Sequence, residues 1–235
     1  MTETAGPVLL CDLDGTLIDS LPDLTAAVGR LLSEMGRAPL AEEVVRRMVG
    51  DGVPKLIERA LAASGGAPPP EALAGIVARY LPIYESMMTA RTRPYPGVPE
   101  TLGALKAAGW RLAVCTNKPE GPTRGILDAL GLAPLFEAVA GGDSFAVRKP
   151  DPGHVFGLLG AMAARPEDAV MLGDGANDVK AARAAGLPVI AVASGYGPVP
   201  VEALDPDIVI AEIAELPAAL TRLGRGPAGS RTGTG

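Results

Sequence analysis

The chain has 235 residues, of which 48% are hydrophobic, and its 21 basic and 27 acidic residues give a formal net charge of -6. A chain of this length and composition can bury a sizeable core, and the lack of any basic run interleaved with aromatic residues argues against a nucleic-acid partner. No apolar run approaches the ~20 residues that a membrane helix needs, and the N-terminus has no charged segment before a long apolar stretch. We therefore expect a cytoplasmic protein with no membrane partner.

Composition also bears on the thiols and on the C-terminal end. Cys11 and Cys115 each lie within an apolar run, which favours free core thiols in a reducing compartment over a disulfide. Residues 226–235 belong to a stretch too rich in Gly, Ser and Thr to pack, so we expect a disordered tail there.

The first predicted element is the apolar run VLLC, residues 8–11, which ends in Asp12. Three later apolar runs end in a similar way: RLAVC before Thr116, AVML before Gly173 and LPVIAVA before Ser194. Each is typical of a buried parallel strand. Segments with helical spacing lie among them, at 99–109, 121–131 and 178–186. This alternation predicts an α/β fold with a Rossmann-like parallel sheet core and helices on both faces.

The alternation fails between residues 21 and 91, where the apolar spacing is helical throughout. Residues 21–35 follow three-and-four spacing, and residues 71–88 form another amphipathic segment after the proline-rich loop GGAPPPE. We therefore expect an inserted α-helical cap domain over residues 21–91. The Rossmann-like sheet core would then comprise residues 1–20 and 92–225.

Polar side chains gather directly after the predicted strands. Parallel strands share one carboxyl edge, where ligands bind in open sheets, so these side chains should meet there. They supply carboxylates, a hydroxyl, an amide and an ammonium group: Asp12 and Asp14; Thr116 and Asn117, followed by Lys118; Lys149; and Asp174 and Asp178.

This set of groups suits phosphoryl transfer assisted by Mg2+. Two or three convergent carboxylates satisfy the oxygen preference of the ion. One carboxylate can attack phosphorus to form an aspartyl phosphate, which leaves the second for proton transfer. Thr116, Asn117 and Lys149 are the donors expected around the oxygens of a transferring phosphoryl group. Each motif alone is also typical of a turn, so it is their conjunction at one edge that favours catalysis.

The motifs DLDGT, the threonine of CTN, the lysine of RKP and GDGAND resemble, in that order, those of the haloacid dehalogenase-like hydrolases. The resemblance runs from Val8 to about Leu223. LIDSLPDL, VGDGVPKLIERAL, RPYPGVPETLGALKAAGWRLAVCTNKPE and GGDSFAVRKPDP are more narrowly similar to the bacterial phosphoglycolate phosphatase family. The resemblance implies a magnesium-dependent phosphatase for a small phosphorylated metabolite. The first candidate reaction converts 2-phosphoglycolate to glycolate and phosphate through an aspartyl phosphate.

The resemblance implies roles for the acids. Asp12 is the implied nucleophile, and Asp14 is the general acid that protonates the leaving oxygen and then the base that activates water. The side chains of Asp12 and Asp174 and the main-chain carbonyl of Asp14 would hold Mg2+.

The remaining matched residues are implied to bind or support the phosphoryl group. Thr116 would contact its oxygens, with Asn117 close by. Lys149 would balance charge on the nucleophile and the phosphate. Asp178 would orient Lys149 or a metal-bound water from behind.

The helical segment resembles the family's cap, which closes over the site and selects the substrate. A substrate with a carboxylate beside its phosphate needs a cation, and Lys55 in VGDGVPK is one candidate for this substrate-binding role. Arg91 and Arg93, near the return to the sheet, are further candidates. His154 has no second histidine or carboxylate at ligand spacing, and we interpret it as structural.

Several alternatives stay open. GDGAND lacks the serine that usually follows the acid in phosphoglycolate phosphatases and resembles phosphoserine phosphatases, so phosphoserine or a sugar phosphate is an alternative substrate. A phosphomutase of the same family would return the phosphoryl group to bound product instead of to water. A phosphoaspartate signalling receiver is the non-enzyme alternative, although such domains are shorter and lack a helical insert. We expect a monomer or a homodimer.

Overall fold

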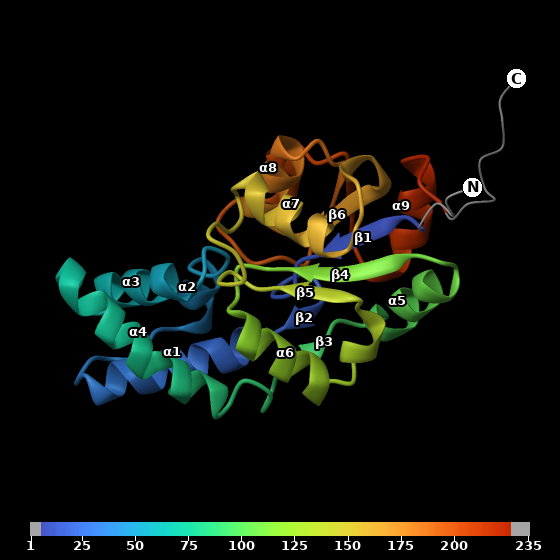
Figure 1. Cartoon of the computed structure of the whole chain (residues 1–235). Helices are drawn as coiled ribbons and strands as arrows, with labels where there is room; N and C mark the ends of the chain where they lie inside the picture. The colour runs from blue at the N-terminus through green and yellow to red at the C-terminus, as the bar shows by residue number, and fades with distance from the viewer. Residues whose placement is uncertain (1–5, 227–235) are drawn as a thin grey trace, which may run out of the picture.

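The computed structural model describes residues 6–226. Its main sheet has six strands: β1 (Val8–Cys11), β4 (Arg111–Cys115), β5 (Ala138–Ala140), β6 (Ala169–Gly173), β7 (Val189–Val192) and β8 (Ile208–Ile210). They lie in the order β5-β4-β1-β6-β7-β8, and all neighbours are parallel (Figure 1). The expected fold class, a Rossmann-like parallel sheet, is confirmed.

Helices cover both faces of this sheet: α5 (Val98–Ala107), α6 (Glu120–Ala129), α7 (Pro152–Ala161), α8 (Ala176–Ala184) and α9 (Leu216–Arg222). Successive side chains of a strand point to opposite faces. Leu9 and Cys11 of β1 therefore pack with α5, α6 and α9, whereas Val8 and Leu10 pack with α7 and α8. Figure 1 shows α7 and α8 on one side of the sheet and α5 and α6 on the other.

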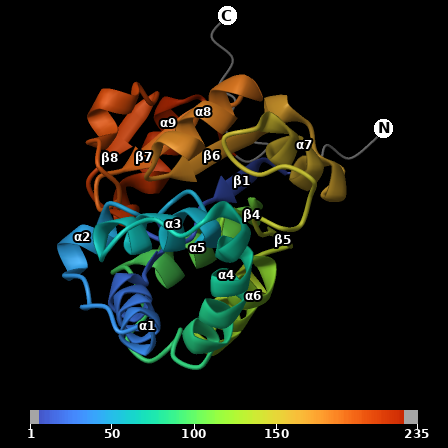
Figure 2. The same ribbon diagram turned by 90° about the vertical axis from the view of Figure 1, so that its left-hand side faces the viewer.

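Between the first and second strands of the sheet the chain forms further helices: α1 (Leu21–Glu34), α2 (Glu42–Arg46), α3 (Val53–Ala63) and α4 (Pro70–Glu85). They lie beyond the carboxyl ends of the strands, and Figure 2 shows them in front of the sheet. Their shared core includes Tyr80 and Tyr84, which are buried and stacked with ring centroids 5.9 Å apart. We call residues 21–91 the insert.

The two ends of the insert are joined at the sheet. β2 (Ile18–Asp19) pairs with β3 (Arg93–Pro94) in antiparallel register. The buried Asp23 carboxylate accepts the N–H groups of Arg91 and Thr92 at 2.8 to 3.1 Å. The chain therefore leaves and re-enters the core at one place, as a cap requires, while the domain boundaries themselves stay a prediction.

The structure adds elements that the sequence patterns did not predict. β5 and β8 have three residues each, so they are too short to show a periodicity, and they form only because β4 and β7 offer ladders to pair with. The helices predicted at 99–109, 121–131 and 178–186 are present with ends shifted by one or two residues.

Three further expectations concern the cysteines, membrane-spanning helices and the C-terminal tail. Cys11 and Cys115 are buried free thiols, as predicted. Within residues 6–226, none of the helices is long and apolar enough to cross a membrane. The tail predicted to be disordered, residues 226–235, lies outside the described residues except for its first.

Candidate active site

Three neighbouring strands deliver the first group of site residues. Asp12 follows β1, Thr116 follows β4 and Asp174 follows β6, and β1 lies between the other two. Beyond the strand ends, the N–H of Asp12 donates to Leu172 O at 2.9 Å and the N–H of Thr116 donates to Ala140 O at 3.0 Å. The sheet ladder therefore holds both residues, and it brings together side chains that are far apart in the sequence.

Lys149 is a buried cation among these acids. Its Nζ lies 3.0 Å from Asp12 Oδ1 and 2.6 Å from Asp178 Oδ1, and it donates to Cys115 O at 2.5 Å. Burial alone would lower the pKa of Lys149, but the charges of Asp12 and Asp178 outweigh it and raise that pKa. Lys149 is therefore charged at neutral pH.

The buried carboxylates outnumber this cation. Burial raises the pKa of Asp12 to about 6, even though Lys149 opposes the shift. Burial, followed by the charge of Asp12, raises the pKa of Asp174 well above its ordinary value. Because one ammonium leaves negative charge uncompensated, a bound cation would lower the free energy of the ionised site.

The acids fit a divalent cation. Carboxylate oxygens of Asp12, Asp174 and Asp178 lie within 4.8 Å of one another. Asp12 Oδ1 is buried, and within residues 6–226 its close polar contact is the ion pair with Lys149 at 3.0 Å, which lacks hydrogen-bond geometry. Asp178 is already engaged, because Oδ1 accepts from Lys149 and Oδ2 accepts the N–H groups of Asp174 and Gly175 at 3.2 and 3.0 Å. The three acids together could hold the metal, and Asp178 also pairs with the ammonium of Lys149.

Close backbone contacts lock Asp174 in place. A Cβ on Gly15 would lie 2.6 Å from Asp174 Oδ2, and one on Gly195 would lie 2.5 Å from Asp174 Cβ. Gly15 also has a φ of +87°, a left-handed conformation that favours glycine. Thr16 Oγ1 and the N–H of Tyr196 donate to the carboxylate at 2.6 and 2.8 Å. The glycine and threonine of DLDGT therefore shape the site for an acid from another strand.

Asp14 is held by Lys118, to which the sequence motifs assigned no role. Lys118 Nζ lies 3.0 Å from each carboxylate oxygen of Asp14 and 2.6 Å from the hydroxyl of Tyr84 in the insert. Ser20 Oγ donates to Asp14 Oδ1 at 2.5 Å. The one signal in the sequence is that Lys118 directly follows Thr116 and Asn117 in CTNK.

Two asparagines connect the sheet to a loop of the insert. Asn117 Nδ2 donates to Gly50 O at 3.0 Å and to Lys149 O at 2.9 Å. Asn177 Nδ2 donates to Gly50 O at 3.1 Å and to Asp51 Oδ1 at 2.7 Å. The asparagine of GDGAND therefore contacts the insert. The amide nitrogen of Asn117 positions loops here, while its buried Oδ1 has no hydrogen-bond partner.

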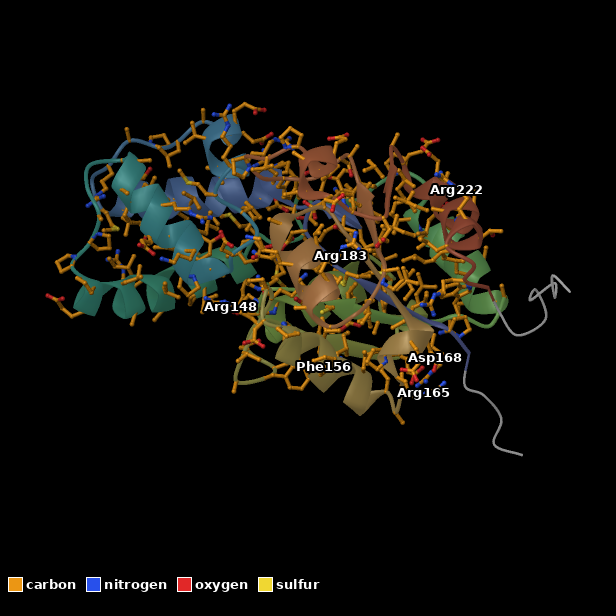
Figure 3. All side chains as sticks on the ribbon, turned by 90° about the horizontal axis from the view of Figure 1, so that it is seen from above. Arg148, Phe156, Arg165, Asp168, Arg183 and Arg222 are labelled. Carbon is orange, nitrogen blue, oxygen red and sulfur yellow. The ribbon has the colours of Figure 1, made fainter. Side chains whose placement is uncertain are left out.

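Arginines flank the same loop. Arg59 pairs with Asp51, and Arg148 stands at the boundary between the insert and the sheet (Figure 3). Arg148 lies close to Gly52: a Cβ added at Gly52 would be 3.6 Å from Arg148 Nη1. Although burial raises the pKa of Asp51, its hydrogen bonds with Asn177 and Arg59 lower it overall. The insert is thus held against the sheet by polar contacts.

Two cavities open between the insert and the sheet. The small cavity, of about 40 Å³, is lined from the sheet by Asp12, Asp14, Thr116, Asn117 and Lys118 and from the insert by Leu24, Val49, Gly50, Gly52, Val53, Leu56 and Tyr84. The large cavity, of about 230 Å³, contains the remaining acids together with Lys149 and Asn177. Asp12 and Asp14 line both cavities.

The cations expected in the insert lie elsewhere. Lys55 is about half exposed, pairs with Glu58 at 2.6 Å and lines neither cavity. Arg91 lies near Asp23, and its guanidinium donates to Pro22 O at 2.5 Å. The exposed Arg93 donates to main-chain carbonyls nearby. The structure therefore does not bring these three residues into the cleft.

His154 supports the loop that carries Lys149. It is buried, and its Nδ1 accepts the N–H of Lys149 at 3.2 Å. Burial, and then the charge of Lys149, lowers the pKa of His154 to about 4. The imidazole is therefore neutral at pH 7, in keeping with a structural role.

This shift predicts a loss of stability in acid. The folded-state pKa of His154 lies below the unfolded value of about 6.5, so unfolding takes up a proton as the pH falls from about 6.5 to 4. The free energy of unfolding should fall by ~2–3 kcal/mol over that range through this residue alone. Urea unfolding at pH 7, 5.5 and 4.5 should show that the free energy of unfolding of the wild-type protein falls relative to that of His154→Asn, which keeps an acceptor but cannot titrate. Equal slopes in the two proteins would contradict this prediction.

With the geometry established, comparison with known proteins identifies the family. The family model described as haloacid dehalogenase-like hydrolase matches residues 7–186. The chain belongs to the haloacid dehalogenase-like hydrolases. It is 44% identical over 212 residues to the phosphoglycolate phosphatase of Rhodospirillum rubrum, covering 88% of both chains. It is 41% identical over 218 residues to that of Caulobacter vibrioides, covering 93% of this chain and 92% of the relative.

A solved structure agrees with these sequence relatives. The crystal structure of a predicted phosphoglycolate phosphatase from Haemophilus somnus superimposes with a TM-score of 0.86 at 32% identity. The match covers 92% of this chain and 98% of the other. The family resemblance expected from the four motifs is confirmed, and this hydrolase has the fold of its relatives over nearly all its length.

Proposed function

We propose that this hydrolase converts 2-phosphoglycolate to glycolate and phosphate with the help of Mg2+. The observation that carries the proposal is that Asp12, Asp14 and Thr116 line one small cavity, because attack, proton transfer and phosphate binding must occur at a single place. The names of the relatives in Rhodospirillum rubrum and Caulobacter vibrioides support the choice of 2-phosphoglycolate.

The first half of the reaction transfers the phosphoryl group to Asp12. A carboxylate oxygen of Asp12 forms a bond to phosphorus as the bond from phosphorus to the glycolate oxygen breaks. Asp14 gives its proton to that leaving oxygen. Thr116 donates to a phosphoryl oxygen, and the Lys149 ammonium balances the charge on Asp12 and on the phosphate.

The second half releases phosphate. Asp14 accepts a proton from water, the water oxygen bonds to phosphorus, and the bond from phosphorus to Asp12 breaks, which regenerates the carboxylate. Asp12, Asp174 and the main-chain carbonyl of Asp14 would hold Mg2+, whose charge neutralises the phosphoryl oxygens when bound. Asp178 keeps the ammonium of Lys149 directed at Asp12.

The test is phosphate release from a panel of 2-phosphoglycolate, phosphoserine and glucose 6-phosphate. We expect 2-phosphoglycolate to have the highest kcat/KM, by at least ~10-fold, the ratio that a contact worth about 1.4 kcal/mol supplies. Preference for phosphoserine or the sugar phosphate would reassign the substrate within the same chemistry. Phosphate release only with an added sugar bisphosphate would indicate a phosphomutase. Cytoplasmic location and a monomeric or homodimeric state remain predictions.

A further inference from the structure

Lys118 is a buried cation that the steps on Asp12 do not use. Its side chain is 4% exposed, and its ammonium reaches both oxygens of Asp14 and the hydroxyl of Tyr84. The ammonium also lies 4.6 Å from the centroid of the Tyr84 ring. A lysine placed in this way costs desolvation free energy, so a purely structural explanation must account for why the position is charged.

Lys118 differs in charge from the other residues that line the small cavity. Of its lining residues, all within the described part of the chain, Lys118 is the one with a positive charge. The insert side offers mainly apolar groups such as Leu24, Val53 and Leu56. Lys149 is engaged with Asp12, Asp178 and Cys115 O and does not line this cavity. An anionic group that enters the small cavity therefore has one ammonium to meet.

The geometry of 2-phosphoglycolate would place its carboxylate near the ammonium of Lys118. In 2-phosphoglycolate the carboxylate carbon is two bonds from the bridging oxygen. That oxygen must approach Asp14 to receive its proton, and Lys118 Nζ is 3.0 Å from the Asp14 oxygens. The substrate carboxylate is thus brought next to Lys118 by the same placement that the proton transfer demands.

The contacts already made by Lys118 match such a ligand. The ammonium of Lys118 binds the Asp14 carboxylate through both oxygens, so there is room around the ammonium for a carboxylate to bind in this way. The Tyr84 hydroxyl accepts from Lys118 at 2.6 Å and keeps its own proton for a second acceptor. Tyr80, stacked behind Tyr84, fixes the ring in the insert.

Resting on the proposed function, we infer that Lys118, aided by Tyr84, is the specificity-determining residue that binds the substrate carboxylate. The residue that recognises the substrate is then a lysine of the loop after β4, two residues beyond the proposed phosphate ligand Thr116, and the insert contributes the tyrosine. This arrangement selects short phosphates with an anion two bonds from the ester oxygen.

The experiment compares two substrates of equal size. 2-Hydroxyethyl phosphate carries a hydroxymethyl group where 2-phosphoglycolate carries its carboxylate. We expect Lys118→Met to lower the ratio of kcat/KM for 2-phosphoglycolate over 2-hydroxyethyl phosphate by ~10–100-fold, the factor for losing a hydrogen bond to a charged group. Lys118→Arg, which keeps the charge, should restore part of the ratio. Lys106→Met, an exposed lysine far from the cleft, should leave it unchanged.

The outcomes separate the inference from the proposed function. If the wild-type protein fails to hydrolyse 2-phosphoglycolate, the proposed function is wrong and this inference with it. If the wild-type protein hydrolyses it and Lys118→Met slows both substrates equally, Lys118 only positions Asp14, and the inference alone is overturned. A fall of the ratio in Lys55→Met instead would move the carboxylate site to the insert.

Binding provides a second measurement should Lys118→Met lose turnover on both substrates. Asp12→Asn, which lacks the nucleophile, should bind 2-phosphoglycolate more tightly than 2-hydroxyethyl phosphate in titration calorimetry. Adding Lys118→Met to this variant should remove the difference between the two Kd values. A difference that persists would contradict the inference.

Discussion

Asp12→Asn is expected to reduce kcat by at least ~10⁴-fold, because the amide oxygen of asparagine is a poor nucleophile toward phosphorus, and such losses follow removal of a nucleophile. The protein should remain folded. Burial raises the pKa of Asp12 to about 6, so its negative charge at pH 7 is unfavourable in the metal-free site, and asparagine removes that charge. Phosphate release and circular dichroism measure the two effects.

Asp14→Asn is the matched control, since it removes an acid two residues away but leaves the nucleophile. With p-nitrophenyl phosphate, whose leaving group needs no protonation, Asp14→Asn should release about one equivalent of p-nitrophenol and then stop, because water is no longer activated. Asp12→Asn should give no burst. A normal rate in Asp12→Asn would place the nucleophile elsewhere.

Removal of divalent metal is expected to abolish turnover and to change the dependence of stability on pH. In chelator, the folded-state pKa of Asp12, about 6, lies above its unfolded value of 3.8, so the folded state binds more protons between these values. The free energy of unfolding should therefore fall as the pH rises from about 4 through 6, by ~3 kcal/mol from this group. Thermal unfolding at pH 4.5, 5.5 and 7 of His154→Asn, which lacks the opposite effect of His154, measures this fall.

Mg2+ should oppose that fall, because it binds the ionised carboxylates and not the protonated ones. The stabilisation by Mg2+ should accordingly be large at pH 7 and small at pH 4.5. Comparing samples with and without the ion at each pH cancels the opposite effect of His154. Asp12→Asn should gain less from Mg2+ than the wild-type protein. An unfolding midpoint that Mg2+ leaves unchanged at pH 7 would argue against a metal at Asp12 and Asp174.

The sequence motifs predicted the positions of those site residues that directly follow a strand, because the sheet fixes the main chain there. Asp12, Thr116 and Asp174 follow strands whose apolar runs are plain in the sequence, so their meeting at one edge follows from parallel pairing. The structure brings them together, and the roles assigned to them remain proposals. The short edge strands β5 and β8 carried no comparable signal, because three residues show no period.

The lysines show the limit of this reasoning. Lys55 follows a glycine-rich loop of the insert and was one candidate for the carboxylate ligand, yet it faces solvent and pairs with Glu58. Lys118 lay unassigned beside Thr116 in the sequence and is buried on Asp14. A lysine side chain is long and flexible, so its main-chain position does not determine where its ammonium lies.

The family, the parallel sheet and the edge at which the acids gather could be predicted from the motifs and apolar runs, because buried strands and short motifs reflect local requirements of the backbone. It takes the folded chain to show which cation faces which acid, and that Asn177 contacts the insert at Gly50 and Asp51. Those pairings join residues more than a hundred positions apart, such as Lys118 and Asp14. They depend on how separate strands, loops and the insert pack against one another, which no local pattern encodes.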